Sequence, residues 1–415
     1  MRLTRQLLGQ AEQALGRLLE FSGPADEALS RYFREHRGLG RQERAFIAET
    51  VFSVLRRKRS LETAAGSTAP SALLAAALLR LQGQSARSLE GLVEPELAAR
   101  IRGARAEAWP VAVRAELPDW LWQRLAAENG DEEALRIAQG MLNGAPLDLR
   151  VNLARTTREA VLEHFARDGI EAAPTPLSPA GVRLSAKPPI NRHELFRAGL
   201  VEVQDEGSQL LAWLVAPRRG EMVADYCAGA GGKTLALAML MRSAGRLYAF
   251  DVSPKRLAAL GPRAARAGIS NVHSVVLTGN NDARAGRLAG KLDRVLVDAP
   301  CSGFGTLRRN PDFKWRLGPA AIDELVAKQT GILQAAARLV KPGGRLVYAT
   351  CSLLKSENEA VADAFAAAQP EFEPLSCGDL LAAQRIDLPG ERLRLRPHLH
   401  GTDGFFAAAF ARRAG

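Results

Sequence analysis

The sequence is poor in cysteine and in aromatic residues. Only four cysteines occur among 415 residues, at positions 227, 301, 351 and 377, and no two of them form a CxxC pair. This spacing argues against a disulfide framework and indicates reduced thiols. Aromatic side chains make up 6% of the chain, but 47% of the residues are hydrophobic. A chain of this length and composition can build about two or three domain cores.

Long apolar runs are absent as well. The longest, LLAAALL at 73–79, is too short to span a bilayer, and the N-terminus lacks the apolar core of a signal peptide. We therefore expect a cytoplasmic protein that does not enter a membrane. We also expect the protein to be a monomer.

Acidic residues are outnumbered by basic ones. The chain has 56 Lys and Arg against 45 Asp and Glu, which gives a formal net charge of +11. A basic surface attracts polyanions such as nucleic acid, although an arginine-rich genome would give the same composition. Nine basic residues stand against three acidic ones between 31 and 59. Such a cluster either binds phosphate groups or forms an ordinary solvent-exposed face.

The hydrophobic pattern divides the chain into three parts. Residues 1–138 carry apolar side chains at helical spacing, as at Phe46, Ile47, Val51 and Leu55, and predict an all-α domain. Residues 145–215 predict a small α+β module that binds RNA. Its expected elements are strands over 147–152 and 181–185, a helix capped by Thr156 and Glu159, and a connecting helix over about 204–215.

Residues 216–415 alternate strands, glycine-rich turns and helices. Segments such as RLYAFDV, DRVLVDAP and GGRLVYATCS are each followed by helical sequence. This alternation predicts an α/β, Rossmann-like domain with a parallel, doubly wound sheet. Ligands of such a sheet bind beyond the carboxyl ends of its strands, where the strand order reverses.

The glycine-rich stretch DYCAGAGGKT at 225–234 resembles two phosphate-binding motifs but fits neither. A P-loop ending in Gly232, Lys233 and Thr234 requires glycine at position 227, where Cys227 stands. The dinucleotide fingerprint fails because Thr234 occupies a position that needs a small apolar residue. Asp251 ends the next strand about twenty residues on, where an acid binds ribose hydroxyls, although it could instead begin the next helix as its N-cap. A nucleoside without phosphates, S-adenosylmethionine, is the leading candidate.

Two cysteines follow strands of this predicted sheet. Cys301 comes after DAP and Cys351 directly follows a strand, so both sulfurs could face one pocket, although a lone cysteine is more often a small buried hydrophobe. A thiol, an acid and a methyl donor together suit methylation of cytosine at C5. Thiolate addition at C6 makes C5 nucleophilic while an acid, here Asp298, holds N3. The site should lower the pKa of the attacking thiol.

These segments resemble a known enzyme family. DYCAGAGGKT, FDVSPKR, LDRVLVDAPCSGFGTLRRNPDFKW and VYATCSLLKSENEAV are similar to the motifs of RNA cytosine-C5 methyltransferases of the Sun (RsmB) family, and HLHGTDGFFAAAF resembles its last strand pair. The resemblance covers roughly residues 145–412. LGRQERAFIAETVFSVLRRKRSLE further resembles the NusB-like RNA-binding domain of the ribosomal RNA branch.

The resemblance implies roles for individual residues. The nucleophile that attacks C6 is Cys351, and Cys301 assists product release. Ribosomal RNA is the implied substrate and S-adenosyl-L-methionine the implied cofactor. The implied cofactor contacts are Cys227, Ala228, Gly229, Ala230, Gly231, Gly232, Lys233, Asp251, Asp282 and Asp298.

The chain departs from the family pattern in two places. Ala230 stands where the loop usually has proline, and Tyr226 replaces a leucine, changes that should loosen the loop without removing a contact. In TGNNDAR at 278–284 the family has a simpler Gly-Asp. We place the adenine-side contact on Asp282, with Asn280 or Asn281 as alternatives.

Other features leave alternatives. RRNPDFKWR at 308–316 mixes basic and aromatic side chains, which either bind single-stranded RNA or pack under the loop. His398 and His400 are expected on one strand face without further ligands, so no metal site is predicted. The alternative functions are a non-catalytic RNA-binding, antitermination-like factor and a cytosine-C5 methyltransferase that acts on tRNA.

Overall fold

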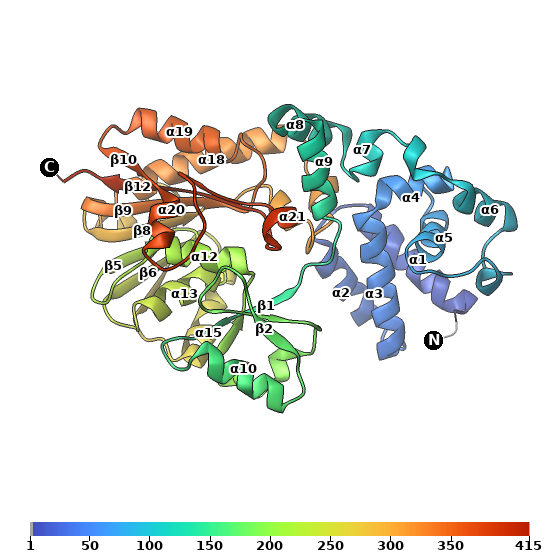
Figure 1. The fold of residues 1–415 in the computed structure, drawn as a ribbon, viewed down its shortest axis with the longest axis horizontal. Coiled ribbons are helices and arrows are strands. Elements are labelled where there is room, and N and C mark those ends of the chain that lie inside the picture. Colours follow the sequence, from blue (N-terminus) through green and yellow to red (C-terminus); the bar gives the residue numbers. More distant parts are fainter. Residues whose placement is uncertain (1–2, 415) are drawn as a thin grey trace. The chain divides into compact units, whose positions relative to one another are not determined.

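The computed structural model describes residues 3–414, and the chain divides into two compact units (Figure 1). The first unit comprises Met1–Gly144 and Thr306–Ala321, and the second comprises Ala145–Gly305 and Ile322–Gly415. Residues 306–321 therefore belong to the first unit, although in sequence they lie between two strands of the second unit. The division does not separate 145–215 from the sheet that follows, so the boundaries expected around these residues stay predictions.

The first unit is helical, which confirms the expected all-α N-terminal region. Ile47, Val51 and Leu55 are completely buried in its core, as the periodicity predicts, while Phe46 packs at the core's edge. Its helices are α1 (Arg5–Leu19), α2 (Ala25–Glu35), α3 (Arg41–Arg56), α4 (Lys58–Ala65), α5 (Pro70–Arg80), α6 (Pro95–Gly103), α7 (Val111–Arg114), α8 (Asp119–Asn129), α9 (Asp131–Gly140) and α17 (Phe313–Arg316), with short 3₁₀ turns at Arg87–Leu89 and Ala106–Ala108.

The basic residues between 31 and 59 fall into two groups with different surroundings. The C-terminal members have structural partners: Lys58 pairs with Glu62 at 2.7 Å and Arg59 pairs with Asp119 at 2.6 Å. The side chains nearer α2 and the start of α3 remain exposed to solvent, namely Arg31, Arg34, Arg37 and Arg41. This second group is the part of the cluster that is most exposed.

The segment 306–321 caps the C-terminal end of α3. The indole Nε1 of Trp315 donates to the Leu55 carbonyl over 2.7 Å, and Lys314 Nζ donates to the Arg56 carbonyl over 2.9 Å. Lys314 is 2% exposed, and burial lowers its pKa to about 7. Of the two interpretations of RRNPDFKWR, the structure favours packing for these side chains.

The second unit begins with a small antiparallel sheet. Its strands β1 (Leu147–Val151), β2 (Ala172–Pro174), β3 (Gly181–Leu184) and β4 (Val201–Val203) lie in the order β2-β3-β1-β4 and are covered by α10 (Arg158–Arg167). The helix cap differs from the prediction by one residue. Thr157, not Thr156, caps α10 and accepts from the Ala160 amide, because Thr156 still belongs to the turn that follows β1. The remaining elements are a 3₁₀ turn at Ile190–Arg192 and α11 (Glu194–Arg197).

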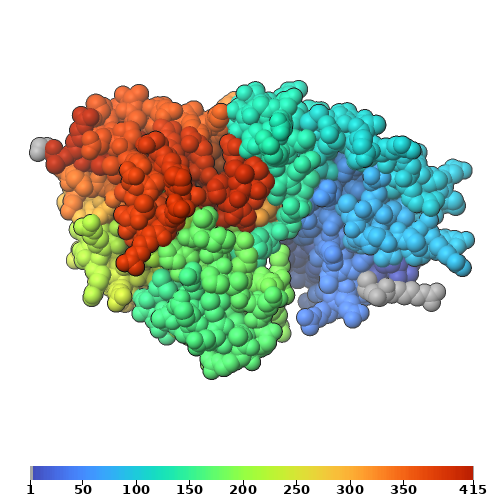
Figure 2. Space-filling view, in the orientation of Figure 1, coloured from blue at the N-terminus to red at the C-terminus, as the bar shows by residue number. Residues whose placement is uncertain are grey.

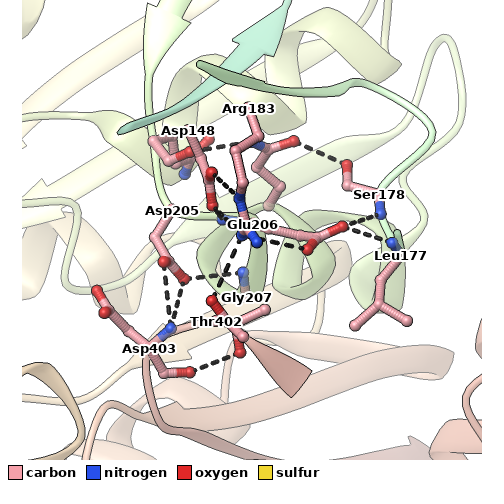
Figure 3. Close-up of polar contacts among 12 residues, drawn as sticks. Asp148, Leu177, Ser178, Arg183, Asp205, Glu206, Gly207, Thr402 and Asp403 are labelled. Carbon is pink, nitrogen blue, oxygen red and sulfur yellow. Dashed lines mark hydrogen bonds and ion pairs between the residues drawn. The ribbon is translucent and has the colours of Figure 1, made fainter. Parts of the chain in front are cut away.

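A buried polar network joins this module to α12 (Glu206–Val215), the helix that the sequence predicts to connect it to the sheet (Figure 3). Arg183 of β3 binds Asp148 of β1 through Nε and Nη2 at 2.7 and 2.9 Å. Glu206 accepts from the amides of Leu177 and Ser178, and Asp205 accepts from the Asp403 amide. In the space-filling view the module, in green, lies beside the red C-terminal residues (Figure 2).

The large sheet contains eight strands and is doubly wound, as expected. The order is β10-β12-β9-β8-β5-β6-β7, with β11 beside β12, and β7, β6, β5, β8 and β9 are parallel. The order reverses between β5 and β8. The strands are β5 (Met222–Asp225), β6 (Arg246–Asp251), β7 (Val272–Val276), β8 (Leu292–Asp298), β9 (Val340–Thr350), β10 (Phe372–Leu375), β11 (Leu393–Leu395) and β12 (Phe405–Arg412).

Helices cover both faces of this sheet (Figure 1). One face packs against α12, α13 (Gly232–Leu240) and α20 (Cys377–Ala382), and the other against α16 (Ala283–Gly286), α18 (Pro319–Ala337) and α19 (Glu359–Ala368). The remaining elements are α14 (Pro254–Ala258), α15 (Leu260–Ala267), α21 (Pro397–His400) and a 3₁₀ turn at Phe304–Thr306.

The region before β12 corrects one prediction. His398 and His400 lie in α21, not on a strand, because Pro397 starts a helical turn and Gly401 ends it with a φ of +69°. Among residues 3–414, no helix is both long and apolar enough to cross a membrane.

Candidate active site

The carboxyl ends of β5, β8 and β9 meet at the point where the strand order reverses. Asp225 pairs with Leu296 in the β5–β8 ladder, and Asp298 pairs with Ala349 in the β8–β9 ladder. The residues that follow these three strands therefore lie at one edge of the sheet. They are the glycine-rich loop, the DAPCS segment and the TCS segment.

The sulfurs of Cys301 and Cys351 lie 3.4 Å apart. The two loops are joined by main-chain hydrogen bonds of 2.8 Å from the Ala299 amide to the Ala349 carbonyl and from the Gly305 amide to the Cys351 carbonyl. The expected convergence of the two thiols is confirmed. Contact with the Cys351 thiol, burial and the nearby Glu357 carboxylate raise the pKa of Cys301 well above its usual value. The lowering expected for an attacking thiol is therefore not found at Cys301.

Lys233 is a positively charged residue that interacts electrostatically with Cys351. Its Nζ donates to Asp298 over 2.6 Å, and the Phe405 ring centre lies 5.5 Å away. Burial alone would lower the pKa of Lys233, but the carboxylate of Asp298 and the thiol of Cys351 outweigh it and raise this pKa. The ammonium is thus held charged between a carboxylate and Cys351.

The glycine-rich loop is fixed by an acid from the neighbouring strand. Asp251, 6% exposed, accepts from the Gly229 amide over 2.7 Å and from the Ser253 amide over 2.8 Å. Ser253, and not Asp251, caps α14. Gly231 has a φ of +87°, and a Cβ there would approach Leu260 within 2.2 Å. The loop can bring its backbone close to a ligand only with glycine here.

Two arginines that the sequence reasoning missed bind the loop's carbonyl groups. Arg150 of β1 donates to the Gly232 carbonyl over 2.8 Å, and Arg263 of α15 donates to the Ala230 carbonyl over 2.5 Å. Both lie far from the loop in sequence, and no spacing rule connects them to it. Arg150 is 5% exposed, so the small module contributes a buried cation to the loop.

Asp225 is buried at the end of β5, and Cys227, two residues further on, is half-buried. Burial raises the pKa of Asp225 to about 7, against the opposing effect of the Thr234 hydroxyl, which donates to it over 2.7 Å. The sequence reasoning missed Asp225 although it stands in the quoted motif. Burial, followed by the charges of Asp225 and Asp298, raises the pKa of Cys227. The Cys227 thiol is therefore a protonated group at neutral pH.

Asp282 is committed to its own turn. It caps α16, accepting from the amides of Thr278 and Arg284 over 2.8 Å, and these bonds together with the Arg284 guanidinium hold its pKa below the usual range. Asp282, Asn280 and Asn281 all line one cavity of about 210 Å³, which Tyr226 also lines. All three proposed adenine contacts thus lie near the loop, and the choice between them stays a prediction.

One group of possible metal ligands occurs among the described residues, away from the sheet's carboxyl ends. Asp168 lies 3.4 Å from His164 Nε2 and 3.0 Å from His193 Nε2. His193 Nδ1 accepts from the Leu195 amide, so the proton of a neutral ring sits on Nε2 and faces the carboxylate. In this arrangement His193 caps the amino end of α11.

Comparisons with known proteins agree with this geometry. Residues 212–411 match the family model described as 16S rRNA methyltransferase RsmB/F, and residues 117–191 match the ferredoxin-like domain described for RsmF/B-like methyltransferases. The second match begins within the helices of the first unit, at α8.

Named relatives point the same way. A protein of Bacillus subtilis named "Probable ribosomal RNA small subunit methyltransferase B" is 36% identical over 73% of this chain and 68% of its own length. "Ribosomal RNA small subunit methyltransferase B" of Sodalis glossinidius is 36% identical over 70% of this chain and 64% of its own, so the match spans about two thirds of these relatives. A crystal structure of a methyltransferase homologue from Pyrococcus horikoshii is 30% identical, with a TM-score of 0.63 over 75% of this chain and all of that one.

Proposed function

Since this chain belongs to the 16S rRNA methyltransferase RsmB/F family, we propose that it methylates carbon 5 of a cytosine in small-subunit ribosomal RNA with S-adenosyl-L-methionine. The observation that carries the proposal is the contact of the Cys301 and Cys351 sulfurs, 3.4 Å apart beside Lys233. C5 methylation of cytosine requires a thiol, and few other group transfers require two in contact. Cytoplasmic ribosomal RNA is the proposed partner, bound by a single copy of the chain.

The residues around the glycine-rich loop suit a nucleoside cofactor. Gly229 and Gly231 leave the backbone open, α13 presents its amino end, and Asp251 places a carboxylate at the end of the next strand. The loop 227–233, Asp251 and Asp298 would hold the cofactor, with Asp282 or a neighbouring asparagine on the adenine side. When bound, the cofactor supplies an electrophilic methyl group.

The chain's own residues would carry the remaining chemistry. The Cys351 thiolate adds to C6 of the cytosine while N3 takes up a proton from solvent, and the Asp298 carboxylate accepts a hydrogen bond from that N3–H, so that the ring becomes a neutral enamine with a nucleophilic C5. After methylation, a base removes the C5 proton, the C6–sulfur bond breaks and Cys351 leaves as a thiolate. A turned-out base is required because neither face of C6 is accessible within a stack.

The surroundings of the two sulfurs support a division of roles. Lys233 interacts electrostatically with Cys351, and this interaction helps to raise the pKa of the lysine. Glu357 acts on Cys301, where its negative charge favours the protonated thiol. A protonated Cys301 beside the sulfur that leaves C6 suits a group that assists product release, and the charged Lys233 suits a nucleophilic Cys351.

The test uses RNA that contains 5-fluorocytosine, because fluorine at C5 blocks the final proton removal and traps the covalent complex. We expect the wild-type chain and Cys301→Ala to form the complex and Cys351→Ala to form none. If Cys351→Ala forms the complex and Cys301→Ala does not, the two roles are reversed.

Methyl transfer from radiolabelled cofactor tests the activity itself. Transfer to 16S ribosomal RNA supports the proposal, and transfer to tRNA alone would reassign the substrate. RNA binding without any transfer would indicate a non-catalytic RNA-binding factor. Bisulfite mapping of ribosomal RNA from a deletion strain would identify the cytosine.

A further inference from the structure

Glu357 is a completely buried carboxylate that the proposed chemistry uses only through its charge near Cys301. It is 0% exposed and lies in the turn between Cys351 and α19. An ionisable side chain is rarely buried to this degree without paired or hydrogen-bonded partners. The groups that donate hydrogen bonds to the carboxylate therefore indicate its role.

Four donors surround the carboxylate. Its Oε1 accepts from the Ser302 amide at 2.8 Å and from Gln329 Nε2 at 3.0 Å. Its Oε2 accepts from the hydroxyls of Ser302 at 2.6 Å and Ser352 at 2.5 Å. An ionised carboxylate has about four acceptor positions and no proton, so this arrangement fills all of them.

Two of these donors are direct neighbours of the two reactive cysteines. Ser302 follows Cys301 and Ser352 follows Cys351, and their hydroxyl oxygens are 3.1 Å apart. Gln329 also donates to the carbonyl of Pro300, the residue before Cys301, over 3.0 Å. One carboxylate thus fixes the chain after Cys351 and, with Gln329, the chain on both sides of Cys301.

The main chain of Glu357 is anchored too. The buried phenol of Tyr348, in β9, donates to the Glu357 carbonyl over 2.5 Å. Asn358 donates to the Ser352 carbonyl over 3.0 Å. The main chain around Glu357 is therefore tied both to β9 and to the residue after Cys351.

We propose that Glu357 is a positioning residue that sets the spacing of the Cys301 and Cys351 sulfurs, so that both can act in turn on one cytosine. The inference rests on the proposed function. The carboxylate itself does not touch the reacting atoms. Its charge adds a second effect, because it raises the pKa of Cys301 and so favours the protonated thiol at the release step.

Glu357→Gln tests this inference, because the amide keeps the size of the side chain but offers only one acceptor oxygen. Glu359→Gln is the matched control: it lies two residues further on and pairs at the surface with Arg394 at 2.6 Å. With unmodified RNA and the full chain, we expect Glu357→Gln to lower kcat at least about tenfold, with KM for RNA and cofactor unchanged within about twofold. The covalent complex with unmodified RNA should accumulate, because attack by Cys351 survives better than release. The alkaline limb of the kcat profile should move to lower pH.

Ser302→Ala and Ser352→Ala keep the test decisive if Glu357→Gln does not fold. Each removes one donor to the same carboxylate, and each should reproduce the fall in kcat to a smaller degree while the circular dichroism spectrum stays unchanged. Equal kcat and equal covalent complex in Glu357→Gln and Glu359→Gln, or in both serine variants and the wild type, would overturn the inference. A wild-type chain without methyl transfer or covalent complex would overturn the proposed function instead, so the two failures are distinguishable.

Discussion

Lys233 and Asp298 form an ion pair of 2.6 Å that joins the glycine-rich loop to the end of β8. Both side chains are shielded, with exposures of 13% and 26%, so solvent screens their attraction only partly. The pair places one loop residue expected to bind the cofactor against the acid expected to hold the cytosine. In the proposed function, cofactor binding and base binding would therefore share an electrostatic element.

Removing the lysine tests its effect on the thiol. In Lys233→Met, the positive charge that interacts with Cys351 and Asp298 is lost, so we expect alkylation of Cys351 by iodoacetamide to become slower. Formation of the covalent RNA complex should fall at least about tenfold, or about 1.4 kcal/mol in activation free energy. Lys291→Met, an exposed lysine bound to the Arg287 carbonyl, is the control. An unchanged alkylation profile in Lys233→Met would contradict this role.

Asp225 should make stability depend on pH. Its folded pKa of about 7 lies above the usual value of 3.8, so the unfolded chain loses this proton first and stability falls as pH rises from about 4 to 7. Asp225→Asn removes the titration. We compare the free energy of unfolding of Asp225→Asn with that of the wild type, measured in urea. Between pH 4 and pH 8 this difference should shift in favour of the variant by up to about 4 kcal/mol, since one pKa unit equals 1.36 kcal/mol. A difference that is constant from pH 4 to 8 would count against it.

Gly305 should tolerate no side chain. A Cβ there would lie 2.2 Å from the Gly404 carbonyl oxygen and 2.8 Å from the Cys351 carbonyl oxygen, both main-chain atoms. Gly305→Ala should therefore separate the two cysteine loops and abolish the covalent RNA complex. Gly286→Ala is the control, because its Cβ meets nothing within 4 Å and alanine favours the end of α16. Wild-type complex formation by Gly305→Ala would contradict the close approach of these loops.

Trp315 should stabilise the helical unit. Trp315→Phe removes the bond to the Leu55 carbonyl but keeps an aromatic ring, and we expect a loss of about 1 kcal/mol in unfolding free energy. Amide exchange should become faster at the C-terminal end of α3. Trp109→Phe, another tryptophan of this unit that lies under Arg80, is a suitable control. If Trp315→Ala weakened RNA binding without changing stability, base stacking would be the correct interpretation.

The sequence predicted what local pattern and strand ends determine. The strands ending at Asp225, Asp251 and Asp298, the helical first unit and the meeting of the two cysteines all follow from periodicity and from the rule that parallel strands share a carboxyl edge. Such features need no knowledge of distant partners.

Several of the features that were missed depend on distant partners. Glu357 receives donors from residues 302, 329 and 352, and no spacing in the chain relates them. Lys314 and Trp315 are typical of an RNA contact in composition, but the helix end that they cap lies more than 250 residues earlier, with sequence separations of 258 and 260. His398 and His400 were placed on a strand because Pro397 was not recognised as a helix start.

The excursion of residues 306–321 means that the polypeptide passes between the two units three times, at 144/145, 305/306 and 321/322. A protease that nicks the first passage alone would leave both fragments associated through the other two. A truncation that starts at Ala145 would retain Lys314 and Trp315 but remove the carbonyl groups at the end of α3 that accept their hydrogen bonds. The shortened enzyme would then expose the segment 306–321, without its packing partner, only a few residues beyond Cys301.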